Sequence, residues 1–180
     1  MISLNYDNRE LIINAFYDLS KDLPFSIIAG TLIAGIPWAT LLAKKHKSPL
    51  IYVRDKPKDH GLKNQIEGIG ADENLSSHHV LLIEDLISTG KSSVNTIKAI
   101  RNAKGNCDYC LSIFNYDLEK AVEEFKELSP NCHINSLVNY ETLLEVARDD
   151  KSINNEQIKM LEEWRQDPFS WGEKHEFVKK

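Results

Sequence analysis

Two adjacent carboxylates, Glu84 and Asp85, stand at the end of an unbroken apolar segment, residues 80–83. A short polar run follows at residues 88–90, Ser-Thr-Gly, and a helix is predicted to begin near Ser92. Carboxylates accept hydrogen bonds from sugar hydroxyls, directly or through a magnesium ion. The start of a helix offers unpaired N–H groups and a positive dipole end, which together bind phosphate. The segment therefore predicts a sugar-phosphate site, with the diol on the acids and the phosphate on the turn.

Two other interpretations of this segment are open. The residues Gly-Lys-Ser at 90–92 could end a Walker A loop, but that pattern needs a glycine at position 85. Asp85 stands there instead and would repel nucleotide phosphates. The segment could also be an ordinary polar turn, although paired acids beside such a turn rarely assemble without a ligand.

The elements that must position these residues alternate along the chain. Strands are predicted at residues 26–29, 49–54, 79–84, 107–114 and 133–138, and helices at 9–19, from 37 to about 45, from about 92 to 103, at 118–128, and around 140–148 and 155–165. Such alternation predicts an α/β fold with a central, mostly parallel sheet flanked by helices. Ligands of these sheets bind at the carboxyl edge of the strands, where both acids are expected. We expect a single domain over residues 1–180.

A polar segment without sustained periodicity, residues 55–78, interrupts this alternation. Loops of this length in a compact domain are usually functional. Arg54, Lys56, Lys58 and His60 concentrate positive charge at its start, within a chain of formal net charge −5. Beside a sugar-phosphate site, these cations would stabilise negative charge on a departing pyrophosphate, and a closing loop would exclude water. Without a neighbouring sugar-phosphate site, the same composition would more often indicate a solvent-exposed loop.

The overall composition excludes several other classes of protein. An excess of 27 acidic over 22 basic residues argues against a general affinity for nucleic acid or anionic membranes. Residues 24–43 carry no charge, but Gly30, Gly35 and Pro37 interrupt them, so a strand, loop and helix explain them better than a membrane span. No signal peptide is recognisable, and we expect a cytoplasmic protein. The three cysteines are too few for a disulfide framework; reduced thiols are favoured over a redox or zinc site.

Four segments of the chain resemble one family in the order in which that family carries them. The sequence EDLISTG at 84–90 resembles the phosphoribosyl pyrophosphate motif of type I phosphoribosyltransferases, and its wording is close to the orotate branch, especially its Gram-positive form. Residues 28–37 look like the pyrophosphate loop of that branch, residues 52–61 like its mobile catalytic loop, and residues 161–165 like its C-terminal helix. The chain is thus identified as resembling an orotate phosphoribosyltransferase of the type I fold.

The resemblance implies an activity and a set of partners. It implies Mg²⁺-dependent transfer of the phosphoribosyl group of phosphoribosyl pyrophosphate to orotate in pyrimidine biosynthesis, giving orotidine 5′-monophosphate and pyrophosphate. It also implies a homodimer in which the mobile loop, about 55–78, covers the active site of the neighbouring subunit. No nucleic acid or membrane partner is expected.

The resemblance also assigns roles to individual residues. Lys58, His60 and Asp85 are expected to be catalytic, and Ser88 matches the position that touches orotate. The pyrophosphate loop includes Thr31, Ala34 and Gly35, whose backbone would hold pyrophosphate and Mg²⁺ without a side-chain metal cluster. The residues expected to bind phosphoribosyl pyrophosphate are Arg54, Lys58, His60, Glu84, Asp85, Leu86, Ile87, Ser88, Thr89, Gly90, Lys91 and Ser92.

The chain departs from the family pattern at a few positions. Asp55 and Ala34 stand where some relatives carry lysine, and Lys91 stands where relatives usually carry a small residue. Family members also carry a longer segment before the helix that begins here near Arg9, and it forms a hood over the base. Residues 1–8 are too short for that hood, so we expect an intact phosphoribosyl half of the site and an impaired base half.

Three alternative functions remain open. The chain could be a phosphoribosyltransferase for another base, although the sequence KPKDHG at 56–61 favours orotate. It could be a truncated or degenerate paralogue that binds nucleotide without catalysis. A regulator that keeps the fold and binds nucleic acid is the third, and such proteins usually add a basic module that this acidic chain lacks.

If the loop is catalytic, Lys58→Ala or His60→Ala should lower turnover more than folding stability. Each change removes a positive charge or proton donor from the departing pyrophosphate without removing a core side chain. Turnover and the thermal midpoint of unfolding would be measured on the same preparations. Variants that unfold would show that the loop is structural.

Overall fold

A computed structural model of the chain describes residues 5–54, 65–70 and 73–175. By its internal contacts the chain divides into two compact units, residues 1–138 and 139–180, and each unit is described by itself. The prediction of one domain over the whole chain therefore stays a prediction. Along the described ranges, no helix has both the length and the apolar character needed to cross a membrane.

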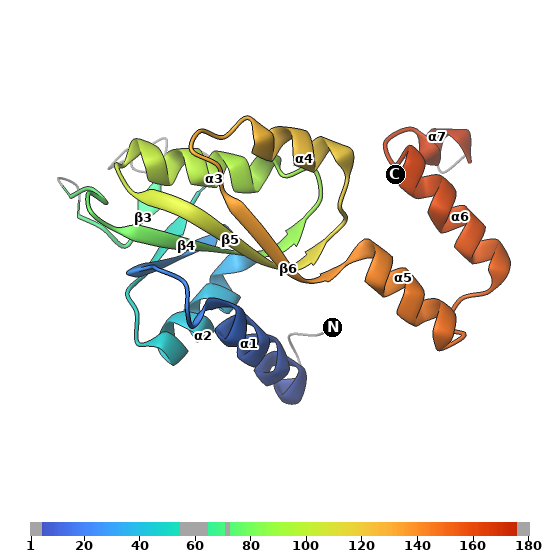
Figure 1. Ribbon diagram of the computed structural model, residues 1–180, viewed down its shortest axis with the longest axis horizontal. Helices are drawn as coiled ribbons and strands as arrows, with labels where there is room; N and C mark the ends of the chain where they lie inside the picture. The colour runs from blue at the N-terminus through green and yellow to red at the C-terminus, as the bar shows by residue number, and fades with distance from the viewer. Residues whose placement is uncertain (1–4, 55–64, 71–72, 176–180) are drawn as a thin grey trace. The chain divides into compact units, whose positions relative to one another are not determined.

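A six-stranded sheet forms the centre of the first unit, with the strand order β3-β2-β1-β4-β5-β6 (Figure 1). β1 pairs in parallel with β2 and with β4, β4 pairs in parallel with β5, and the short β3 is antiparallel to its neighbour β2. The strand bounds are β1 Ile27–Thr31, β2 Leu50–Val53, β3 Ile66–Glu67, β4 His79–Ile87, β5 Asn106–Asn115 and β6 His133–Asn139. The prediction of an α/β fold with a mostly parallel sheet is confirmed.

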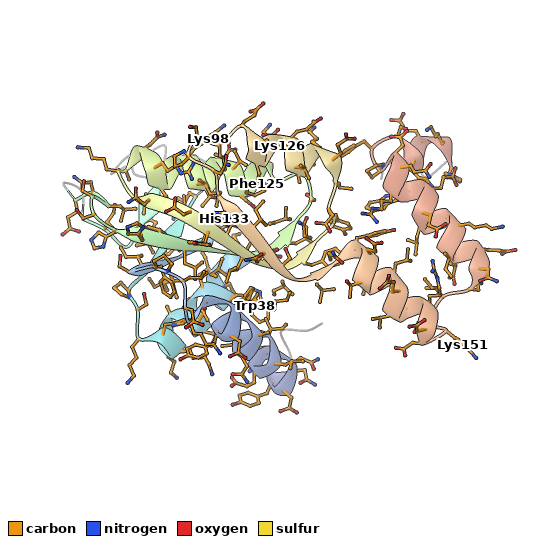
Figure 2. All side chains as sticks on the ribbon, viewed as in Figure 1. Trp38, Lys98, Phe125, Lys126, His133 and Lys151 are labelled. Atoms are coloured by element: carbon orange, nitrogen blue, oxygen red, sulfur yellow. The ribbon has the colours of Figure 1, made fainter. Side chains whose placement is uncertain are left out.

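Helices cover both faces of this sheet (Figure 1). α1 (Tyr6–Ser20) and α2 (Gly35–His46) lie on one face, and α3 (Lys91–Asn102) and α4 (Glu119–Lys126) lie on the other. Figure 2 labels one large aromatic side chain from each layer, Trp38 of α2 and Phe125 of α4. Each helix presents its apolar stripe to the sheet, so that two hydrophobic cores sandwich the strands.

β4 is the strand that both cores share. Val80 and Leu82 belong to the core under α3, whereas Leu81 and Ile83 belong to the core under α2, and all four side chains are at most 2% exposed. Successive side chains on a strand point to opposite faces, so a strand buried on both sides needs apolar residues without alternation. This is why residues 80–83 are continuously apolar, as the sequence analysis inferred.

Two predicted boundaries near the site are wrong. β4 continues through Asp85 and Leu86 to Ile87, because the parallel pairing with β5 extends to Ile87 and Asn115; the turn is only residues 88–90. The segment predicted as one loop, residues 55–78, also contains structure: β3 pairs with β2, and the side chain of Leu75 is 1% exposed. Single apolar residues in a polar segment give no periodicity, so sequence patterns did not reveal these contacts.

The second unit consists of the helices α5 (Tyr140–Asp149), α6 (Asn155–Gln166) and α7 (Trp171–Lys174). Tyr140 joins the first two helices, because its hydroxyl donates to the Leu161 carbonyl at 2.9 Å and its ring lies 5.5 Å from that of Trp164. Asn154 and the third helical residue, Gln157, form a reciprocal capping box that fixes the start of α6. The predicted helix over 155–165 is thus confirmed, whereas α7 was not predicted.

His46, at the end of α2, lies in an aromatic and partly buried environment. Its ring centroid is 4.6 Å from Tyr17 and 5.1 Å from Phe25, and its Nε2 lies 2.8 Å from the Ser20 hydroxyl oxygen. The Ser20 hydroxyl also donates to the Phe16 carbonyl at 2.7 Å, so hydrogen bonds link the end of α2 to α1. Burial, and then the positive charge of Lys45, lower the pKa of His46.

This lowered pKa should make the protein less stable in mild acid. The unfolded chain binds a proton at His46 near pH 6.5, whereas the folded chain resists it, so the free energy of unfolding falls as the pH drops through about 6.5. Urea unfolding between about pH 8 and pH 5.5 would show the fall, and His46→Gln should reduce it. A slope that His46→Gln does not alter would contradict this role.

Candidate functional site at the carboxyl edge of the sheet

The carboxyl ends of β1 and β4 lie side by side, because these two strands pair in parallel in register from Ile27 and Val80 onwards. β1 continues through residues 32–34 into α2, on one face of the sheet, and β4 continues through residues 88–90 into α3, on the other. The chain thus leaves the sheet in opposite directions at neighbouring strands. Ligands of open α/β sheets bind at this kind of switch point, between two helix N-termini.

On the β1 side, the chain turns very close to β4. A Cβ atom at Gly35 would lie 2.5 Å from the Ile83 carbonyl oxygen, so only glycine fits at the first residue of α2. The turn before it contains a cis peptide bond between Leu32 and Ile33. Thr31, the last residue of β1, is 2% exposed, and its hydroxyl oxygen has no hydrogen-bond partner among the described residues. A buried hydroxyl without a partner beside a helix start fits a site that an anion completes.

On the β4 side, the two acids have different surroundings. Glu84 is 4% exposed, and its Oε1 accepts a hydrogen bond of 2.8 Å from the hydroxyl of Ser93, in the first turn of α3. Asp85, the next residue along the strand, is half-buried and points to the opposite face. The two carboxylates therefore lie at one edge of the sheet but differ in burial.

The turn after β4 depends on Gly90, which is the N-cap of α3 and has a φ of +77°. A Cβ atom there would lie 3.0 Å from the Phe125 ring, so α4 packs directly behind this turn. The first N–H groups of α3 have no acceptor within the helix, as in any helix, and they follow the turn. Gly90 therefore satisfies both the backbone conformation of the turn and the close packing of α4 behind it.

The residues predicted from the resemblance occupy three kinds of environment. Ser88 and Thr89 are half-buried in the turn, whereas Lys91 and Ser92 are exposed at the start of α3. Leu86 and Ile87 lie in β4, where the side chain of Ile87 is 1% exposed and belongs to the core, so only its backbone can face a ligand. The structure thus brings residues 84–92 together at one edge, while their individual roles stay predictions.

Arg54 follows β2 and is held by β3. Its Nε donates to Glu67 Oε1 at 2.9 Å, and its carbonyl oxygen accepts from the Gln65 side chain at 2.7 Å. Neither partner was predicted from the sequence, because residues 55–78 are polar, show no sustained periodicity and were expected to form one loop. Lys58 and His60, the predicted catalytic residues of that loop, lie outside the described residues.

Ser93, one of the hydroxyl residues expected from the sequence to donate hydrogen bonds beside the turn, donates to Glu84. In the sequence, the apolar spacing of Val94, Ile97 and Ile100 predicts the buried face of this helix, and the hydroxyl of Ser93 lies close to that face. No metal cluster assists the acids, since no group of three His, Cys, Asp or Glu side chains within the described ranges could hold an ion. The edge therefore offers two helix starts for anions and two carboxylates for hydroxyls.

Comparison with curated proteins decides the family of the chain. It is 39% identical over 167 residues to an orotate phosphoribosyltransferase from Coxiella burnetii, covering 92% of this chain and 77% of that protein. It is 42% identical over 170 residues to the orotate phosphoribosyltransferase of Lactobacillus johnsonii, covering 93% and 77%. The chain belongs to the orotate phosphoribosyltransferase family. The resemblance inferred from the four sequence segments is thereby confirmed.

Solved structures agree on the fold of this orotate phosphoribosyltransferase family member. The crystal structure of orotate phosphoribosyltransferase from Aeropyrum pernix matches with a TM-score of 0.68 and 23% identity, covering 80% of this chain and 78% of that one. An adenine phosphoribosyltransferase from Thermoanaerobacter pseudethanolicus matches with a TM-score of 0.64 and 17% identity, covering 77% and 84%. The type I phosphoribosyltransferase fold is therefore confirmed. No protein-family model matches the chain.

The approach of Gly35 to β4 predicts that Gly35→Ala will disturb the site. The added methyl group would meet the backbone of Ile83, which cannot rotate away, so α2 must shift at its start. We expect a loss of about 1–3 kcal/mol in the free energy of unfolding, the usual cost of overpacking. Urea denaturation would measure this loss. Gly70→Ala is the matched control, because its methyl group would meet the end of the flexible Glu73 side chain; equal losses in both variants would contradict the prediction.

Proposed function

We propose that this chain transfers the phosphoribosyl group of phosphoribosyl pyrophosphate to orotate, giving orotidine 5′-monophosphate and pyrophosphate in pyrimidine biosynthesis. The observation that carries the proposal is the membership of a family whose curated relatives bear this name, at about 40% identity over most of the chain. The two helix starts and the two acids at the sheet edge supply the groups that such a substrate needs.

In this proposal the turn at residues 88–90 and the start of α3 hold the 5-phosphate. The N–H groups of the first helical turn donate to the phosphate oxygens, and the positive dipole end adds to the attraction. Lys91, exposed at the first residue of α3, adds a full positive charge close to these groups. Ser88 and Thr89 contribute hydroxyl groups from the half-buried turn, and Ser88 faces the base.

The other half of the substrate occupies the β1 side. The backbone of residues 31–35 holds the pyrophosphate at the start of α2, and the buried hydroxyl of Thr31 is available as a donor there. During transfer, the bond from C1 of the ribose to pyrophosphate breaks while a bond from C1 to a ring nitrogen of orotate forms. Positive charge develops on the ribose ring, and the nearby carboxylates of Glu84 and Asp85 stabilise it.

A magnesium ion fits this arrangement of residues. The available donors are carboxylate, hydroxyl and backbone oxygens, which Mg²⁺ prefers. Asp85 and the backbone of residues 31–35 would complete its ligands. When bound, the ion neutralises negative charge on the pyrophosphate.

The remaining groups come from the loop that begins after Arg54. Lys58 and His60 stabilise the departing pyrophosphate, and closure of the loop excludes water from the reactive sugar. We further propose a cytoplasmic homodimer in which each loop covers the partner's site, since the family resemblance of residues 52–61 implies shared sites. Neither nucleic acid nor membrane takes part.

The assay follows the absorbance of orotate with phosphoribosyl pyrophosphate and Mg²⁺. Asp85→Asn removes one carboxylate from the sugar while keeping the size of the side chain, so KM for phosphoribosyl pyrophosphate should rise about 10- to 100-fold, as expected for a hydrogen bond to a charged group. Asp108→Asn is the matched control, since it makes the same change on β5, near the opposite edge of the sheet. Full activity on uracil or a purine, with none on orotate, would reject the proposed substrate.

A further inference from the structure

The Glu84 carboxylate is the least exposed charged group of the site, and its burial needs a compensating contact. Taking a carboxylate out of water is unfavourable unless hydrogen bonds replace the lost solvent. Ser93 on α3 provides such a bond, because its hydroxyl lies 2.8 Å from Glu84 Oε1. Ser93 is itself only 2% exposed, so water does not compete for this bond.

The neighbours of Glu84 on β5 include a thiol and a hydroxyl group. Cys110 is the thiol; burial, and then the negative charge of Glu84, raise its pKa well above the ordinary value. Cys110 therefore stays a neutral thiol beside the acid. Ser112, which is opposite Glu84 in the β4–β5 pairing, is fully buried, and its hydroxyl oxygen lies 2.6 Å from that of Ser136 on β6.

The bond from Ser93 also links two parts of the ligand site. Ser93 is the third residue of α3, within the turn whose N–H groups would receive the phosphate, and Glu84 lies on the strand before that turn. An ionised carboxylate has about four acceptor positions, so a bond from Ser93 leaves capacity for a sugar hydroxyl. One hydrogen bond thus fixes the distance between the phosphate-binding turn and one of the acids.

We propose that Ser93 is a positioning residue, which holds Glu84 so that a ribose hydroxyl meets this carboxylate when the 5-phosphate sits on α3. The proposal rests on the proposed function for the nature of the ligand. It assigns no direct contact between Ser93 and the substrate. Its specific consequence is that loss of the Ser93 hydroxyl weakens recognition of the sugar but not of the phosphate.

Two probes separate these effects in the full chain. Inorganic phosphate reports the α3 turn alone, whereas ribose 5-phosphate reports the turn and the acids together. Ser93→Ala should raise the dissociation constant of ribose 5-phosphate about tenfold, as for a lost hydrogen bond to a charged group, and change that of phosphate by less than about twofold. Titration calorimetry with both probes measures this. Equal weakening of both probes would show that Ser93 only supports the start of α3, and no weakening of either would show that Glu84 needs no help; each result overturns the proposal.

Thr96 is the matched control on the same helix. Its side chain is 1% exposed, and its hydroxyl has no hydrogen-bond partner among the described residues, so Thr96→Val should leave both dissociation constants unchanged. If Ser93→Ala does not fold, Ser93→Cys keeps the volume with a weaker donor and should give an intermediate loss for ribose 5-phosphate alone. Binding of the probes does not require transfer, so the inference and the proposed activity fail separately: a wild-type chain that binds ribose 5-phosphate but leaves orotate unchanged contradicts only the activity.

Discussion

The burial of β4 on both faces is the constraint on which the rest of the structure depends. A central strand with parallel neighbours on each side needs apolar side chains on both faces wherever helices cover it, and residues 80–83 meet this need. Each fully buried Leu or Ile side chain stabilises the fold by about 1.5–3 kcal/mol relative to an exposed one. Because β4 is packed on both faces, the turn that follows it has a fixed position. The polar residues at the end of β4 are therefore held in a defined position against α3.

Close backbone contacts transmit this rigidity to the site. Gly35 brings α2 against the Ile83 carbonyl of β4, and Gly90 brings the start of α3 against Phe125 of α4. Both helix starts are therefore located by packing against neighbours rather than by side-chain caps, which neither helix has. An anion that binds at either start meets N–H groups whose direction is already set, so little ordering accompanies binding.

The sequence predicted the parts of this arrangement that depend on periodicity and on short signals. The apolar run of β4, the glycine-bearing turn and the amphipathic spacing of α3 led to the correct fold class and to the correct edge of the sheet. The end of β4, the strand β3 and the core contact of Leu75 were missed, because pairing partners far along the chain decide them and no local pattern marks them. The different burial of Glu84 and Asp85 could not be predicted from the sequence either, because it depends on which elements pack on each face of β4.

The ion pair between Arg54 and Glu67 has a consequence for how the site would engage an anion. With side chains 32% and 24% exposed, the pair is partly buried and only partly open to water. Glu67 holds the Arg54 guanidinium in one orientation at the end of β2, so an anion that binds Arg54 must compete with this carboxylate. Dissolved salt screens the pair and a contact between Arg54 and an anion in the same way, so the outcome of that competition depends on geometry more than on ionic strength.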